Sequence, residues 1–154
     1  MVAAATKLAP APGLAVLRRA RFFAGLAPAQ LERVGALARV ERFPQETRIY
    51  VLGDSADDFY VLASGMVRFT LGLGKRETSA GEIIRRGDVF GWAALVAGAQ
   101  KRIATAFCLT PCEVIALDRN GLRALMDGDH SIGYAIMTQC SLLLTSELTS
   151  FAAG

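Results

Sequence analysis

The chain has 154 residues, of which 53% are hydrophobic and 20% are charged, and its formal net charge is +3. This composition excludes a disordered chain and suits a single domain with a hydrophobic core. The basic excess is too small and too dispersed for a nucleic-acid-binding surface. The three cysteines form no paired framework, which favours a reducing compartment, and we expect the protein in the cytoplasm.

The N-terminal residues 1–13 are rich in alanine and proline, and we expect a flexible tail there, followed by one domain over residues 14–154. The tail lacks the basic start and apolar core of a secretory signal. The longest uncharged stretch, 131–146, is short for a membrane span, so no membrane association is expected. Short helices are predicted over 14–23 and 28–38, with Pro28 at a first helical position.

Between residues 40 and 117 the chain changes to short apolar runs that are separated by glycine and aspartate. Strands are predicted over residues 48–52, 58–62, 66–73, 77–85, 102–109 and 112–117. Short strands at this spacing, with turn residues between them, are typical of an antiparallel sandwich or barrel. The predicted fold class is therefore mainly β with flanking helices.

Helices are predicted again at the C-terminal end. Asp118 can cap a helix over residues 119–126, and Gly128 can end it. Asp129 can cap a longer helix, which we expect over residues 130–151. The architecture is thus N-terminal helices, a β-barrel and a long C-terminal helix.

The long C-terminal helix is apolar on more than one face. The barrel can cover only one face, so the remaining apolar stripe needs another surface. We therefore expect a homodimer built on residues 130–151, with a coiled-coil-like seam between the two copies. The residues expected near their symmetry mates are Met137, Cys140, Leu144 and Leu148.

One helical segment, residues 91–97, interrupts the predicted strands, and a loop leads from it to Arg102. A helix that starts at a glycine presents free backbone N–H groups, which favour an anion together with the helix dipole. Ala93 and Ala94 are small, so a ligand can approach the backbone closely. Arg102 would return beside this end and offer a bidentate fork to a phosphate. On chemistry alone, a packing turn with an exposed arginine is the commoner outcome of so short a motif.

The order of glycines and acidic residues extends this pattern over most of the chain. The motifs are Asp54-x-x-Asp57-Asp58-Phe59-Tyr60-Val61-Leu62-x-Ser64-Gly65, Gly87-Asp88-x-Phe90-Gly91, Ala94-Leu95 and Arg102-x-Ala104. In these motifs, residues 22–148 resemble the cyclic-nucleotide-binding domain family, which includes the catabolite activator proteins and the regulatory subunits of cyclic-AMP-dependent protein kinase. The resemblance implies an antiparallel jelly-roll barrel flanked by helices, with residues 91–104 as the phosphate-binding cassette.

The resemblance also implies the ligand-binding residues. In the cassette these are Gly91, Trp92, Ala93, Ala94, Arg102, Ile103 and Ala104. On the last helix, Thr145 and Ser146 are candidate contacts for a ligand base, as hydroxyls on this helix are in the catabolite activators.

Two cassette positions depart from the family pattern. The family has a glutamate after Phe-Gly, whose carboxylate accepts a hydrogen bond from the ribose 2′-hydroxyl, and this chain has Trp92. An indole nitrogen donates a hydrogen bond but cannot accept one. The residue after the family's arginine is often Ser, Thr or Ala, and here it is Ile103. Trp92 can therefore either stack on a base or fill the pocket and close it.

Two functions follow from these residues. The first is a regulatory sensor that binds a cyclic nucleotide or a related phosphorylated ligand in the cassette and signals through its C-terminal helix. The alternative is a ligand-free interaction and dimerisation domain that has lost nucleotide binding. Either would act on a protein partner that the sequence does not identify. No helix-turn-helix follows the last helix, so we expect no DNA binding by this chain.

An enzyme on the same barrel is a third and remote reading. The chain shows no Ser–His–Asp, Cys–His or paired-carboxylate arrangement. His130 is the only histidine, so a metal-binding barrel is a poor interpretation, and we expect neither a metal nor a cofactor. Asp54, Asp57 and Asp58 could form a cation site, but the family pattern makes them turn residues.

Overall fold

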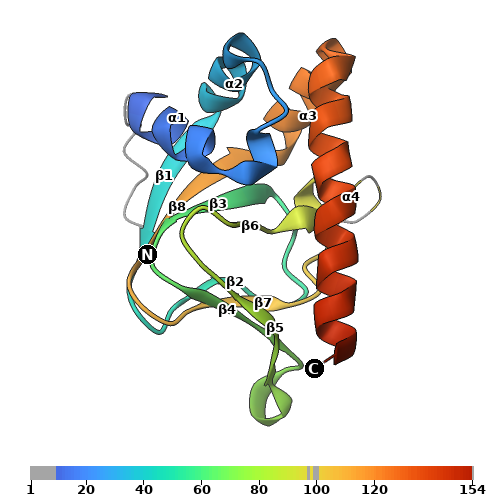
Figure 1. The fold of residues 1–154 in the computed structure, drawn as a ribbon. Coiled ribbons are helices and arrows are strands. Elements are labelled where there is room, and N and C mark those ends of the chain that lie inside the picture. The colour runs from blue at the N-terminus through green and yellow to red at the C-terminus, as the bar shows by residue number, and fades with distance from the viewer. Residues whose placement is uncertain (1–9, 97, 99–100, 154) are drawn as a thin grey trace.

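The computed structural model describes residues 10–96, 98 and 101–153. Two four-stranded antiparallel sheets lie one above the other, the N-terminal helices cover one end, and a long helix stands along one side (Figure 1). This is the predicted jelly roll with flanking helices, built from two separate sheets. Within the described residues, no helix is long and apolar enough to cross a membrane.

The N-terminal region forms α1 (Pro10–Arg19), the short 3-10 helix η1 (Arg21–Phe23) and α2 (Pro28–Gly35). Residues 1–9 of the predicted tail, 1–13, lie outside the described residues. Helix α1 begins at Pro10, earlier than the predicted helix start at residue 14. Helix α2 begins at Pro28 as predicted but ends at Gly35, because the chain enters a strand at Ala38.

Each sheet is formed by strands that are distant in the sequence. The first has the order β1–β8–β3–β6, made of β1 (Ala38–Phe43), β8 (Cys112–Asp118), β3 (Asp58–Ser64) and β6 (Val89–Phe90). The second has the order β2–β7–β4–β5, made of β2 (Arg48–Tyr50), β7 (Thr105–Cys108), β4 (Val67–Leu71) and β5 (Thr78–Ile84). A 3-10 turn, η2 (Gly74–Arg76), joins β4 to β5.

The first sheet is buried on both faces, which explains the continuous apolar runs in β3 and β8. Phe59 and Ile115 face the helices, whereas their neighbours Tyr60 and Val114 face the second sheet. Side chains of a strand alternate between the two faces, so one run of residues supplies both cores. Burying each large apolar side chain stabilises the fold by roughly 1.5–3 kcal/mol. This doubly packed sheet is the fixed frame behind the candidate site.

The C-terminal helices begin at the predicted caps. The Asp118 carboxylate accepts a hydrogen bond from the Gly121 N–H at 2.9 Å and starts α3 (Arg119–Gly128). The Asp129 carboxylate accepts from the Ser131 N–H at 3.0 Å and starts α4 (His130–Ala153). Such caps satisfy backbone donors that have no partner within the helix.

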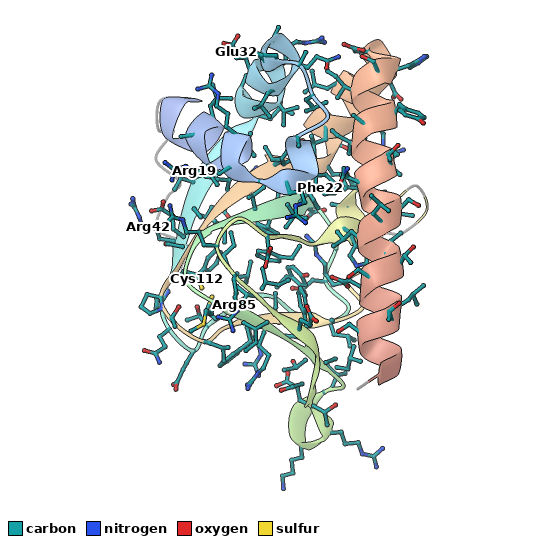
Figure 2. The ribbon with its side chains drawn as sticks, in the orientation of Figure 1. Arg19, Phe22, Glu32, Arg42, Arg85 and Cys112 are labelled. Atoms are coloured by element: carbon teal, nitrogen blue, oxygen red, sulfur yellow. The ribbon has the colours of Figure 1, made fainter. Side chains whose placement is uncertain are left out.

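Helix α4 lies along η1 and β5 (Figure 1). Its first half is anchored in the core by Ile132, Ile136 and Cys140. Figure 2 shows the labelled Phe22 of η1 on the side of the molecule that faces α4, whereas Cys112 lies at the opposite end. The second half of α4 is thereby held beside the segment that leads from β6 to β7, where the candidate ligand residues lie.

Candidate functional site

The cassette begins with a glycine in the left-handed region of the backbone. Gly91 has φ +81°, and one 3-10 turn, η3 (Trp92–Ala94), follows in place of the longer helix predicted over residues 91–97. A Cβ at Gly91 would lie 3.1 Å from Arg102 Nη1 and 3.1 Å from the Tyr60 ring. Both the backbone angle and this crowding therefore call for glycine. Residues 97, 99 and 100 of the predicted cassette lie outside the described residues.

Arg102 is fixed beside this turn by its main chain. The Arg102 N–H donates to the Asp54 carbonyl, and the Gly53 N–H donates to the Arg102 carbonyl, each at 2.8 Å. The Asp54 carboxylate in turn accepts from the Val51 N–H at 2.9 Å, which holds the turn. The turn after β2 thus places the arginine at the mouth of the space between the sheets.

The Arg102 side chain points inward and is only 4% exposed, so it is not the exposed arginine of a packing turn. Its Nη1 donates to the Gly91 carbonyl at 3.0 Å, and its Nη2 donates to the Asp58 carbonyl at 2.6 Å. The guanidinium carbon lies 4.1 Å from the centre of the Tyr50 ring, a cation–π distance. The predicted meeting of Arg102 with the start of the cassette turn is therefore present.

The charge of Arg102 has no carboxylate partner within 4.0 Å among the described residues, and its buried Nε has no hydrogen-bond acceptor there. The nearby Asp58 carboxylate pairs with Arg39 at 3.0 Å instead. A buried charge is costly unless it is paired, and aromatic and carbonyl contacts compensate only part of that cost. An anion beside Arg102 would supply the missing partner.

A small hollow of about 20 Å³ lies against Arg102, which is room for about one water molecule. Its lining residues are Tyr50, Phe69, Gly91, Trp92, Ala93, Arg102, Ile103, Ala104 and Glu147. Trp92 comes from the cassette and Glu147 from α4. The Trp92 indole Nε1 donates to Glu147 Oε2 at 3.1 Å, so a hydrogen bond joins the two sides of the hollow.

A larger hollow of about 430 Å³ lies next to the small one, between β5 and α4. The two share Phe69 and Glu147 in their walls. Its polar side chains include Arg21, Gln139, Ser146 and Ser150. Its volume lies in the range of small-molecule sites, and its walls mix apolar and hydrogen-bonding groups. Together, the hollows run from a buried cation to a polar strip on α4.

Burial governs the ionisation of the side chains around these hollows. Burial raises the pKa of Glu147, and the hydrogen bond from Trp92 offsets only part of this rise. Burial also raises the pKa of Tyr50 and of Tyr60 well above the usual value, although the positive charge of Arg102 opposes it. Both phenols therefore stay neutral near pH 7. They offer Arg102 an aromatic face and no negative charge.

The structure brings most of the predicted ligand residues together. Six of them line the small hollow: Gly91, Trp92, Ala93, Arg102, Ile103 and Ala104. Ala94 does not line it, because its side chain packs into the core behind the cassette. Ser146 lines the larger hollow, whereas Thr145 is exposed and its hydroxyl donates to the Ser141 carbonyl at 3.0 Å. Ala94 and Thr145 are thus placed away from the site that the sequence predicted for them.

Sequence reasoning missed three wall residues: Tyr50, Phe69 and Glu147. Glu147 is the only charged side chain in residues 131–154, and an isolated carboxylate on an apolar helix was a usable clue. Tyr50 and Phe69 carried no such clue, because aromatic residues are common in strands.

The acidic residues near the cassette do not converge on one point. Asp54 bonds within its own turn, Asp57 accepts from the Ser55 hydroxyl at 2.7 Å, and Asp58 pairs with Arg39. Within the described part of the chain, no group of three or more His, Cys, Asp or Glu side chains could hold a metal ion. The three cysteines are free and buried.

Several known proteins share this fold. A cyclic nucleotide-binding domain from Methylobacillus flagellatus has a TM-score of 0.75 and 16% identity, over 91% of this chain and 78% of that one. The Thermus thermophilus catabolite activator protein has a TM-score of 0.69 and 26% identity, over 80% of this chain and 58% of that one. The regulatory domain of Toxoplasma gondii PKA, solved with cAMP, has a TM-score of 0.72 and 22% identity, over 86% and 49%.

No curated protein matches the chain with comparable significance. The model of the cyclic nucleotide-binding domain family matches residues 40–129, which is more than half of the sequence and includes both the cassette and the strands that hold it. With the two sheets and the buried arginine at the cassette, this match identifies the chain as a member of the cyclic nucleotide-binding domain family.

Proposed function

We propose that this chain is a regulatory sensor that binds a cyclic nucleotide or a related phosphorylated ligand at Arg102 and acts through α4. The single observation that carries the proposal is the buried, unpaired charge of Arg102 beside the hollows. Binding rather than catalysis, without a cofactor, suits the small hollow, whose polar side chains are the Arg102 guanidinium, the neutral Tyr50 phenol, the Trp92 indole and one carboxylate, Glu147. The free thiols suit the reducing cytoplasm.

The shape of the hollows supports a ligand with an anionic end and a larger uncharged part. An anionic group at Arg102 would pair the guanidinium, which already forms a fork of donors. The rest of the ligand would occupy the larger hollow, where Ser146 and Gln139 offer hydrogen bonds. Glu147 lies between these two parts, so a ligand that spans both must displace it or bond to it.

Calorimetric titration with cyclic AMP, cyclic GMP and a cyclic dinucleotide tests this function. We expect one of these ligands to bind with a dissociation constant in the micromolar range or below. Adenosine, which lacks the phosphate, serves as the control and should bind far more weakly. Absence of heat with all three nucleotides would contradict the sensor function.

The alternative function is a ligand-free interaction domain, and one observation favours it. The hollow at Arg102 holds only about 20 Å³ because Trp92 and Glu147 meet across it. If this arrangement never opens, no nucleotide can reach Arg102. The titration separates the two functions, because the alternative requires no binding at any ligand concentration.

We further propose that α4 carries the signal by pairing with a second copy or with another protein. Its outer side exposes Tyr134, Leu142 and Leu148, at 78%, 60% and 71%. The predicted seam needs correction: Cys140 is 1% exposed and lies in the core, and Leu144 packs against that core. The exposed stripe is therefore Tyr134, Met137, Leu142 and Leu148, which we call the outer stripe. Leu142 also lines the larger hollow.

A further inference from the structure

Among the described residues, one hydrogen bond between side chains joins the cassette to α4 across the small hollow. Trp92 Nε1 donates to Glu147 Oε2 at 3.1 Å, and the Trp92 ring also packs against the core. Cys140 is the last fully buried side chain of α4 among the described residues, so the segment after Leu144 is anchored only lightly. This bond is therefore well placed to control how closely the end of α4 lies against the cassette.

The contact between Trp92 and Glu147 occupies space that a ligand at Arg102 would need. Glu147 lines both hollows and stands between the larger one and Arg102. Its carboxylate is near enough to Tyr50 to add negative charge at the wall of the small hollow, where an anionic ligand would enter. A phosphate cannot fit the small hollow as it stands, because only about one water fits there.

We propose that Trp92 and Glu147 form a latch that holds α4 against the cassette, and that an anionic ligand reaches Arg102 only when the latch opens. The identity of the ligand rests on the proposed function, whereas the latch itself can be tested without any ligand. Because opening frees the end of α4, the latch couples the state of the cassette to the surface that α4 presents.

The latch has a defined pH dependence. Burial raises the pKa of Glu147 above its ordinary value of 4.5 in the closed state, whereas the open state exposes the carboxyl to water. A group with a higher pKa in the closed state favours closure when it is protonated. The latch is therefore tightest below the ordinary pKa of glutamate and loosens as the pH rises through the raised pKa.

Other charged and titratable groups lie around the two hollows that Glu147 lines. Arg102 and the neutral phenol of Tyr50 lie on the side of the small hollow. Arg21, Glu82 and Asp88 line the larger hollow. Among these residues, Glu147 is the carboxylate that accepts a hydrogen bond from Trp92, so a substitution at position 147 isolates the contribution of this group.

The fluorescence of Trp92 tests the latch without ligand, because Trp92 is the only tryptophan of the chain. We expect its emission to titrate with a midpoint above 4.5 in the parent protein. Glu147→Gln keeps an acceptor oxygen but cannot titrate, so this transition should disappear. Glu32→Gln, at an exposed position of α2 (Figure 2), is the matched control and should keep it. A transition that survives Glu147→Gln while circular dichroism shows an intact fold overturns the latch.

A second measurement tests the competition with ligand. Trp92→Phe keeps an aromatic ring and removes the N–H donor. We expect about five- to tenfold tighter binding of cyclic AMP than in the parent, and faster amide exchange over residues 144–153, because a hydrogen bond to a charged acceptor is lost. Equal or weaker binding with unchanged exchange overturns the latch. If neither protein binds any nucleotide, the proposed function fails, and the exchange and fluorescence results still decide the latch.

Discussion

Arg102 shows how one residue can hold a charge inside the fold without an ion pair. Its donors reach the Gly91 and Asp58 carbonyls, and its flat guanidinium lies over Tyr50. Lysine could not reproduce this arrangement, since an ammonium has no planar fork. The side chain is therefore held in place before any ligand arrives, and a bound anion gains the charge without the cost of ordering it.

Two substitutions of Arg102 should distinguish the contribution of its positive charge to ligand binding from the contribution of its planar fork of donors. We expect Arg102→Ala to weaken binding of the nucleotide by about 2 kcal/mol or more, because a buried phosphate loses a charged partner. Arg102→Lys keeps the charge without the fork and should lose less. Calorimetry on folded protein measures both. An unchanged affinity in Arg102→Ala would remove this residue from the ligand site.

Substitution of Gly91 should destabilise the fold through both backbone strain and crowding of the added Cβ. Gly53 has the strain without the crowding, so it separates the two effects. Both have a positive φ, +81° and +91°, but a Cβ at Gly53 meets nothing within 4 Å. Gly53→Ala should therefore cost about 1–2 kcal/mol of unfolding free energy from backbone strain alone. Gly91→Ala should cost more, because its Cβ crowds Arg102 and Tyr60. Urea unfolding compares the two, and equal losses would show that the crowding is relieved at no cost.

Local sequence pattern predicted the cassette turn and the return of Arg102, but not what surrounds the arginine. Tyr50 comes from β2, whose pairing with β7 changes register between Arg48 and Tyr50. Which side of the strand Tyr50 faces depends on that irregularity, and no local pattern encodes it. Glu147 approaches Trp92 only because α4 packs along β5, a tertiary contact.

At the scale of elements, the helix caps and six of the strands follow their local sequence, whereas β1 and β6 do not. Strand β1 was missed because its apolar Ala38 and Val40 alternate with the charged Arg39 and Glu41 over a length that also suits the end of a helix. Strand β6 has two residues and exists only through its pairing with β3, Tyr60 opposite Phe90 and Val61 opposite Val89. Such elements form through pairing with a distant strand, which explains why sequence periodicity could not predict them.

The Asp118 cap carries a prediction at this scale. Asp118→Ala removes the acceptor for the Gly121 N–H and should lower the free energy of unfolding by about 1 kcal/mol. Asp118→Asn keeps an acceptor oxygen and should lose less. Thermal and urea unfolding measure both. A similar loss in the two variants would assign the effect to charge rather than to the cap.

In the whole molecule, the first sheet and the N-terminal helices hold the first half of α4 (Figure 1). Residues of its second half line the larger hollow. The larger hollow, the latch and the outer stripe therefore all involve residues of α4. Under the proposed function, we expect a change at Arg102 to reach a partner through α4, since the sheet behind the cassette is packed on both faces.

The outer stripe carries the last prediction, a homodimer through α4. Tyr134, Leu142 and Leu148 are exposed large apolar residues on one side of the helix, and a second copy would bury them. Leu148→Glu places a charge in that seam and should give a monomer at micromolar concentration, by light scattering. Leu73→Glu is the control, since Leu73 is equally apolar and 62% exposed but lies in the turn between β4 and β5. Leu144→Glu would instead disturb the core. A monomeric parent protein would contradict the dimer and leave the outer stripe to a different protein partner.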